Sequence, residues 1–329
     1  MKQQDVPVLQ YPWTYEIGPF SQSFYEEQNN WIDTDYQFIS EVTRAQYKKH
    51  GLVEAASYMF PAASTKEHIR PIARSMVWLT LFDDYYELCP VDKLADIRDH
   101  IMDVMLGEQP KASDIGLIKQ VALSRQEFIP YVNDDWFIRW TKDFYNYTTY
   151  GIMEGTPYKL KKEFPTLSKL LLIREYSIFM YPYGDSVEPS INYIVPGYIS
   201  EHPIIKRLKM LMCRIIAIQN DFASIEKVLG IDTEVLNIIL VIRNQYTISL
   251  GEAITEAMHI HDSYVQEFVE LRNNLPDFGV QQKNVVRFVH NMALMISGLG
   301  AWYHKGNSTR YKTSGEFLKP EYGIITQCF

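Results

Sequence analysis

Three acidic side chains, Asp83, Asp84 and Glu87, stand at the end of an apolar helical stripe. The apolar positions before them recur at steps of three or four, as on the core-facing side of an amphipathic helix: Ile69, Ile72, Met76 and Leu79. Asp83 and Glu87 continue that stripe. Buried carboxylates are costly unless they are paired or bind a metal, and oxygen ligands at this density suit magnesium. The pattern therefore indicates a metal site, and a helix end that reaches solvent is the simpler alternative.

A second apolar stripe turns polar in the same way, at Asn220 and Ser224. These residues lie one turn apart on a helix expected over 202–228. An amide oxygen and a hydroxyl at that spacing can ligate one magnesium ion from the side opposite to the aspartates. Taken alone, the pair fits an exposed helix end equally well.

The elements that must position these groups are helices. Helical periodicity and capping residues predict a long helix over 64–87. It is preceded by a helix that Thr34 or Asp35 would cap and that ends near 49, and by a short apolar stretch over 52–60. Further helices are expected over 92–106, 113–128, 134–153, 166–180, 202–228, 231–250 (with a loop), 255–275 and 281–304. Residues 1–34 are expected to form an N-terminal strap and 305–314 a loop. Because no strand-like alternation of useful length occurs, we predict an all-α, single-domain helical bundle over 1–329.

Composition narrows the classes of function. The chain has 329 residues and a net charge of −8, so nucleic acid is an unexpected partner. No apolar run approaches a membrane span, which predicts no stable membrane insertion. The N-terminus lacks the apolar region of a secretory signal, and three cysteines are too few for a disulfide framework. We therefore expect a cytoplasmic protein.

Aromatic residues make up 14% of the chain. They fill either a bulky core or the wall of an aromatic-lined cavity. The cavity interpretation proposes four aromatic side chains as cavity candidates: Phe60, Trp78, Trp136 and Trp302. Ser177 is a fifth, polar cavity candidate.

The order of these motifs along nearly the whole chain resembles the class I terpene synthases. The resemblance implies a class I terpenoid synthase bundle with a central active-site cavity, in which Asp83 is the metal-binding aspartate and Asp84 and Glu87 complete its motif. It implies that Asn220 and Ser224 are two members of a metal-binding triad. It implies four residues that would bind the substrate diphosphate: Arg174, Lys227, Arg310 and Tyr311. All of these except Lys227 would also be catalytic residues, together with Asp83.

The resemblance also implies an activity and its ligands. Three Mg²⁺ ions would assist the ionisation of a linear isoprenyl diphosphate, and carbocation cyclisation would follow. Farnesyl diphosphate is the expected substrate and geranylgeranyl diphosphate the alternative. A homodimer is left open, and residues 305–314 would close over the diphosphate.

Two positions depart from the family pattern. The triad expects a carboxylate four residues after Ser224, and Val228 stands there, which weakens the second metal subsite. Asp221 lies nearer the right face than Glu226, which is about 200° from Ser224 around a helix. The family also has a helix break after its diphosphate-sensing arginine. Ser177 fits the position before that break, but Ile178 follows, so either the break comes at Pro182–Gly184 or the trigger works differently.

Two alternatives stay open at this stage. An isoprenyl chain-elongating synthase would need a second aspartate-rich motif, and the later helix carries Asn220-Asp221 followed by Phe222, Ala223 and Ser224 instead. A catalytically impaired protein that binds prenyl ligands is the alternative from another class, and Val228 is the feature that favours it.

Overall fold

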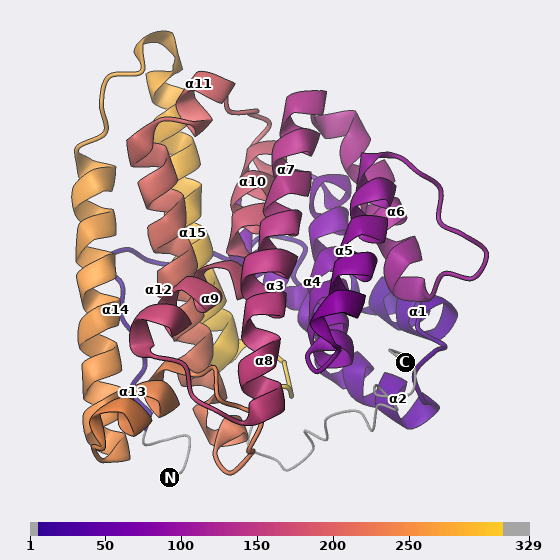
Figure 1. The fold of residues 1–329 in the computed structure, drawn as a ribbon. Coiled ribbons are helices and arrows are strands. Elements are labelled where there is room, and N and C mark those ends of the chain that lie inside the picture. Colours follow the sequence, from indigo (N-terminus) through magenta and orange to yellow (C-terminus); the bar gives the residue numbers. More distant parts are fainter. Residues whose placement is uncertain (1–5, 312–329) are drawn as a thin grey trace.

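The structure is a computed structural model that describes residues 6–311. The described residues contain no strand, and their helices lie alongside one another in a bundle (Figure 1). The α-helices in chain order are α1 Tyr25–Asp35, α2 Glu41–Lys49, α3 Leu52–Met59, α4 Lys66–Tyr86, α5 Val91–Leu106, α6 Gly116–Phe128, α7 Asp134–Asn146, α8 Glu154–Lys161, α9 Leu167–Ser177, α10 Met180–Ser190, α11 Gly197–Ser200, α12 Pro203–Val228, α13 Ile238–Tyr246, α14 Leu250–Asn273 and α15 Gln282–Lys305. The predicted all-α fold is confirmed.

Side-chain caps explain where several helices begin. Thr65 accepts a hydrogen bond from the backbone of His68 at the start of α4, and Ser249 forms a reciprocal capping box with Glu252 at the start of α14. Ser40 caps α2, so this helix begins at 41 rather than at the predicted cap near 34 or 35. Pro71 is accommodated within α4.

The N-terminal strap is shorter than predicted. Residues 6–24 are irregular, but 25–35 form α1, which buries Gln28, Trp31 and Ile32 on one face. The irregular part lies against α15: the indole nitrogen of Trp13 donates to the carbonyl of Ala293 over 2.7 Å. The breakers of this region lie before α1, and the spacing of its buried residues is helical.

The helix predicted over 134–153 continues to Lys161 and changes its winding on the way. After α7 the chain forms a π-helical segment, Tyr147–Met153, and then α8. Within this segment Gly151 lies against α9, and a Cβ added there would be 2.6 Å from the backbone nitrogen of Ser177. Glycine therefore permits the close approach of these two elements.

The predicted helix break at Pro182–Gly184 is wrong. The chain breaks at Ile178 and Phe179, where Phe179 adopts φ +62°, and α10 runs through both Pro182 and Gly184. Pro182 is the third residue of α10, where its missing N–H would have no helical partner. Ser177 is the last residue of α9, so the break directly follows it.

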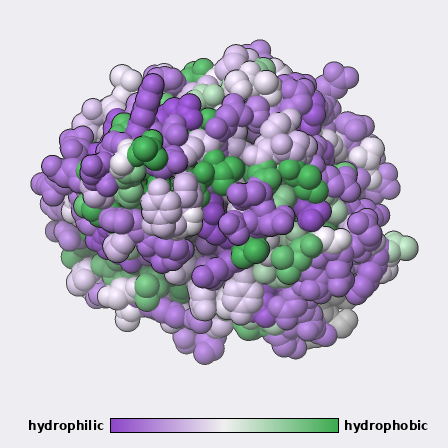
Figure 2. Space-filling view, turned by 90° about the horizontal axis from the view of Figure 1, so that it is seen from above, coloured by the Kyte–Doolittle hydropathy of each residue, from purple (hydrophilic) through white to green (hydrophobic). Residues whose placement is uncertain are grey.

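Two hydrophobic clusters hold the described helices together. The larger runs through most of the bundle, and the smaller joins the C-terminal half of α12 to α13 and α14. No described helix combines the length and the apolar character needed to cross a membrane. The end of the bundle that carries α11 presents mostly hydrophilic residues, with small hydrophobic patches between them (Figure 2).

Candidate active site

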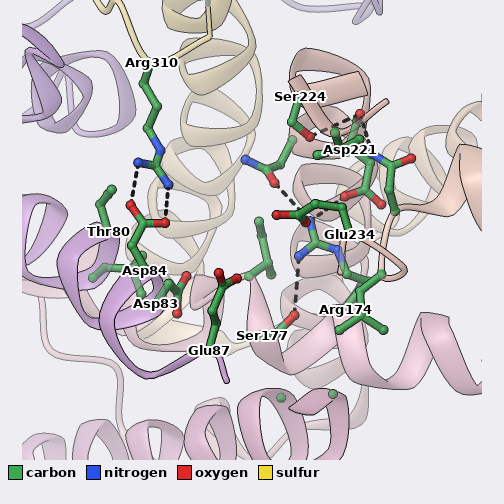
Figure 3. Close-up of a pocket in the computed structure, with 18 of the residues that line it drawn as sticks. Thr80, Asp83, Asp84, Glu87, Arg174, Ser177, Asp221, Ser224, Glu234 and Arg310 are labelled. Carbon is green, nitrogen blue, oxygen red and sulfur yellow. Dashed lines mark hydrogen bonds and ion pairs between the residues drawn. The ribbon is translucent and has the colours of Figure 1, made fainter. Parts of the chain in front are cut away.

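A cavity of about 200 Å³ lies between α4, the π-helical segment, α9, α12 and the end of α15. It brings together residues that are far apart in the sequence. The following predicted site residues line it: Asp83, Asp84, Glu87, Arg174, Ser177, Asn220, Ser224, Lys227, Trp302, Arg310 and Tyr311. The last turn of α4 faces α12 across this space (Figure 3).

The three acidic residues at the end of α4 each have a different partner. Asp83 accepts a hydrogen bond from the hydroxyl of Tyr147. Asp84 accepts hydrogen bonds from both terminal nitrogens of Arg310, over 2.8 and 2.9 Å. It also accepts a hydrogen bond from the hydroxyl of Tyr47. Glu87 forms an ion pair with Lys159 of α8 over 2.9 Å. The carboxylate of Asp84 therefore holds the segment after α15 in this structure, and its metal role stays a prediction.

Arg174 connects α9 to α12. Its Nη2 donates to Oδ1 of Asp221 over 2.6 Å and to Oδ1 of Asn220 over 3.0 Å. Its Nη1 lies 3.4 Å from the hydroxyl of Ser177, directly before the chain break. Among the described residues its buried Nε has no hydrogen-bond partner, so one donor remains for a ligand.

The triad residues of α12 are set by their neighbours. The Nδ2 of Asn220 donates to the hydroxyls of Tyr303, over 3.1 Å, and Tyr311, over 3.2 Å. Asp221, the residue between the two motif positions, accepts from Arg174 and from the backbone nitrogen of Ile238 over 2.8 Å. Asp221 thus fixes Arg174 and the start of α13.

Burial and neighbouring charges shift the pKa values of the two aspartates of α4 in opposite directions. Burial raises the pKa of Asp83 to about 7, opposed by its hydrogen bond from Tyr147 and the charge of Lys159. Burial also acts on Asp84, but the guanidinium of Arg310 outweighs it and holds the pKa of Asp84 well below its usual range. Asp84 is therefore the anionic partner of the pair, and Asp83 carries a proton more readily.

The aromatic predictions divide into cavity wall and core. Trp302 lines the cavity, whereas Phe60, Trp78 and Trp136 do not and belong to the larger hydrophobic cluster. Their positions have a physical reason: the indole nitrogens of Trp78 and Trp136 donate to the carbonyls of Leu117 and Asp185, each over 2.9 Å. Those bonds turn both rings toward α6 and α10. Phe60 packs edge-on against Tyr183.

Among the cavity residues that sequence reasoning missed are Lys159, Glu234 and Tyr303. Lys159 lies beyond Gly155 and Pro157, which look like the end of a helix. Glu234 lies in the segment between α12 and α13, where no periodicity guides an interpretation. Tyr303 follows the predicted Trp302 on α15, and it gave no signal apart from that neighbour.

The donor chemistry of this cavity fits magnesium that is bound together with a phosphate ligand. Carboxylate, amide and hydroxyl oxygens face one another from α4 and α12. Within residues 6–311 no three acidic, histidine or cysteine side chains converge tightly enough to hold a metal ion by themselves. Magnesium commonly completes such a partial set with water and substrate phosphate oxygens.

The chain is similar in sequence and in fold to known terpene synthases. The germacrene A synthase of Nostoc punctiforme is 21% identical over 319 residues, which cover 94% of this chain and 96% of that protein. The (+)-T-muurolol synthase of Roseiflexus castenholzii, described as cyclising (2E,6E)-farnesyl diphosphate, is 24% identical and covers 92% of this chain and 93% of its own. The crystal structure of 2-methylisoborneol synthase from Streptomyces coelicolor, in complex with Mg²⁺ and 2-fluoroneryl diphosphate, superposes with a TM-score of 0.81 at 18% identity, over 95% of this chain and 99% of that one.

A model of the family described as "Terpene synthase family 2, C-terminal metal binding" matches residues 74–267, which is more than half of the chain. This range contains the acidic end of α4, Arg174 and the polar end of α12. The chain therefore belongs to terpene synthase family 2 and is a class I terpene synthase.

Proposed function

We propose that this enzyme carries out the magnesium-dependent ionisation of farnesyl diphosphate and cyclises the resulting cation, releasing a sesquiterpene and diphosphate. One observation carries the proposal: oxygen ligands from α4 and α12 face each other over a cavity that also holds four cationic side chains. These are Lys159, Arg174, Lys227 and Arg310.

The chain's own residues would divide the work of binding. Arg174, Lys227 and Arg310 would bind the diphosphate, and Tyr311 would contact it from the segment that follows α15. Asp83, Asp84 and Glu87 from α4, with Asn220 and Ser224 from α12, would hold magnesium. Bound magnesium supplies positive charge that stabilises the departing diphosphate. Fixed donors in a site shielded from water are more effective than the same groups in solvent.

The apolar part of the cavity would receive the isoprenyl chain. Trp302, Leu299 and Met180 line it, and the ring face of Trp302 can steady a carbocation by cation–π attraction. Because the cavity is about 200 Å³, below the usual range for ligand sites of about 300–1,000 Å³, it favours the fifteen-carbon over the twenty-carbon substrate. The farnesyl-cyclising relative supports the same choice.

The test is incubation with ten-, fifteen- and twenty-carbon linear isoprenyl diphosphates, with and without Mg²⁺. Mass spectrometry of the organic extract identifies the product, and a colorimetric assay measures released diphosphate. We expect a cyclic hydrocarbon or alcohol from farnesyl diphosphate, abolished by a metal chelator. A twenty-carbon product would replace the substrate assignment, and no diphosphate release from any of the three would favour the prenyl-binding alternative.

A further inference from the structure

The α12 side of the cavity lacks a carboxylate where the helix would supply one. Val228 lies one turn beyond Ser224 and is 5% exposed. It lines the cavity and also belongs to the smaller hydrophobic cluster. A valine offers no oxygen, so the metal subsite of α12 has only the neutral ligands Asn220 and Ser224 on the helix itself.

Asp221 is committed elsewhere. Its Oδ1 accepts from Arg174 over 2.6 Å and its Oδ2 from the backbone nitrogen of Ile238 over 2.8 Å. The residue is 3% exposed. Turning this carboxylate toward a metal would leave Arg174 and the first turn of α13 without their acceptor. Asp221 therefore acts as a positioning residue for Arg174.

A different carboxylate reaches the cavity from the loop that follows α12. Glu234 lines the cavity together with Asn220, Ser224 and Val228. The chain turns back after α12 through two backbone hydrogen bonds: Ile231 N to Val228 O, 3.1 Å, and Glu234 N to Ile231 O, 3.0 Å. These turns return residue 234 to the end of the helix. Figure 3 shows the Glu234 side chain beside Arg174 and Asp221, on the cavity side of α12.

The segment that carries Glu234 is anchored directly after it. Val235 is 2% exposed, and a Cβ added to Gly155 of α8 would lie 2.7 Å from Cδ1 of Leu236. The Nδ2 of Asn237 donates to the backbone carbonyl of Asp221 over 2.9 Å. Three consecutive residues thus fix the backbone next to Glu234, as a metal ligand requires.

The cavity places Glu234 near both groups of proposed metal ligands. It lines the same cavity as Asp83 and Glu87 of α4 and as Asn220 and Ser224 of α12.

We propose that Glu234 supplies the carboxylate that α12 lacks and, with Asn220 and Ser224, holds a divalent cation when a diphosphate is bound. This inference rests on the proposed function of the same site. It gives the subsite a net negative ligand, and ligand charge is a main determinant of affinity for hard divalent cations. With Glu234 as a ligand, the metal site would be complete although position 228 is a valine.

The test compares Glu234→Gln with the matched control Asp232→Asn. Both changes remove one negative charge from the same loop, but Asp232 is exposed and pairs only weakly with the exposed Lys162. The thermal melting of the full-length protein is followed while Mg²⁺ is titrated at a fixed concentration of inorganic diphosphate. For Glu234→Gln we expect the half-maximal Mg²⁺ concentration to rise at least about tenfold, since even indirect ligand partners cost 10–100-fold in metal affinity. Asp232→Asn should match the wild type.

Equal titrations for the wild type and Glu234→Gln would overturn the inference. At saturating Mg²⁺ the affinity of Glu234→Gln for diphosphate should approach that of the wild type. A deficit that Mg²⁺ does not remove would mean that Glu234 acts through Lys159, which would also overturn it. If the wild type itself shows no stabilisation by Mg²⁺ with diphosphate, the proposed function fails as well. A response of the wild type that Glu234→Gln shares leaves the proposed function standing.

Discussion

At the scale of single residues, the site consists of charged groups that already have partners within the protein. Asp84 and Arg310 form a two-bond ion pair across 226 positions of sequence, and Glu87 is paired with Lys159. The order of motifs predicted which residues meet at this cavity, because each motif has its own spacing. It could not predict which charges pair, because pairing depends on how distant helices are oriented.

Replacing Asp83 by asparagine should abolish turnover and stabilise the ligand-free protein. The folded-state pKa of Asp83 is about 7, against 3.8 for the free group. The native state therefore binds the proton more tightly, and the ionised carboxylate lowers stability as pH rises through this interval. At pH 8 we expect Asp83→Asn to gain about 1 kcal/mol of unfolding free energy, because the residue is only part-buried and water screens the effect. The gain should vanish near pH 4.

Chemical denaturation at pH 8 and pH 4, with product assays alongside, tests this trade-off. Turnover of Asp83→Asn at the wild-type rate would show that Asp83 is not a metal ligand. A loss of stability at pH 8 would show that its carboxylate is satisfied when ionised.

Lysine should not replace Arg174. The guanidinium of Arg174 makes hydrogen bonds to Asp221, Asn220 and Ser177 from two different nitrogens, and a single ammonium group cannot reproduce that fork. We expect Arg174→Ala to lose nearly all activity, Arg174→Lys to recover little of it, and both to lose stability. For the alanine variant the loss should be about 3 kcal/mol, because Asp221 stays buried without its cation.

Arg207→Ala is the control for Arg174. Arg207 also binds a carboxylate with two nitrogens, that of Glu267, but the pair is largely exposed. Its removal should cost less than about 1 kcal/mol and leave kcat unchanged. Full activity of Arg174→Lys in the same assay would show that Arg174 contributes only its positive charge and not the geometry of its guanidinium group.

At the scale of elements, the sequence predicted helices well and their interruptions poorly. Helices bounded by a capping residue, a glycine or a proline, such as α4 and α5, were found within a few residues. The break at Phe179 was missed because a phenylalanine with positive φ is held by its surroundings and has no signature in the sequence. Pro182 misled in the opposite direction, since proline in the first turn is compatible with a helix.

Gly151→Ala should disturb the active site through the packing of two elements. The added methyl group would lie 2.6 Å from the nitrogen and 2.7 Å from the Cα of Ser177. Both atoms are backbone, so the π-helical segment and the end of α9 must separate. We expect a loss of about 1–3 kcal/mol in stability and a lower kcat, because Arg174 and the chain break move with α9.

Gly251→Ala is the matched helical control. A Cβ added at Gly251 meets nothing within 4 Å, so this variant should be neutral or gain up to about 1 kcal/mol from its better helix propensity. Denaturation curves and kcat of the two variants decide the matter. Equal stability of the two would mean that the packing at Ser177 relaxes without cost.

At the scale of the whole molecule, the buried charges do not all lie at the cavity. Arg139 of α7 binds Glu188 of α10 over 2.7 Å, and Lys209 of α12 forms an ion pair with Asp185. These groups are buried, and burial raises the pKa of Glu188 above its usual range.

The homodimer stays a prediction that analytical ultracentrifugation can test.

The ligand-free protein should be most stable at about pH 6. Carboxylates whose folded-state pKa is raised, among them those of Asp83, Asp143, Glu188 and Asp221, favour the protonated state and add stability as pH falls from 8. Burial lowers the pKa of His50 to about 3, against 6.5 for the free group, so stability is lost as pH falls below 6.5. Melting at pH 6 should exceed melting at pH 8 by about 2–5 °C. A melting temperature that rises from pH 6 to pH 8 would contradict the assignment of raised carboxyl pKa values.

The ion pair between Arg310 and Asp84 would couple the binding of the two ligands if Asp84 holds magnesium and Arg310 binds the diphosphate, as proposed. A metal cation that arrived alone would meet a carboxylate already paired with arginine, and a diphosphate that arrived alone would meet an arginine already paired with a carboxylate. Either ligand alone would have to break a buried pair and leave one charge uncompensated. When both arrived together, Asp84 would exchange arginine for the metal and Arg310 would exchange the carboxylate for the diphosphate. The proposed site would then bind the metal and the diphosphate together more favourably than either one alone.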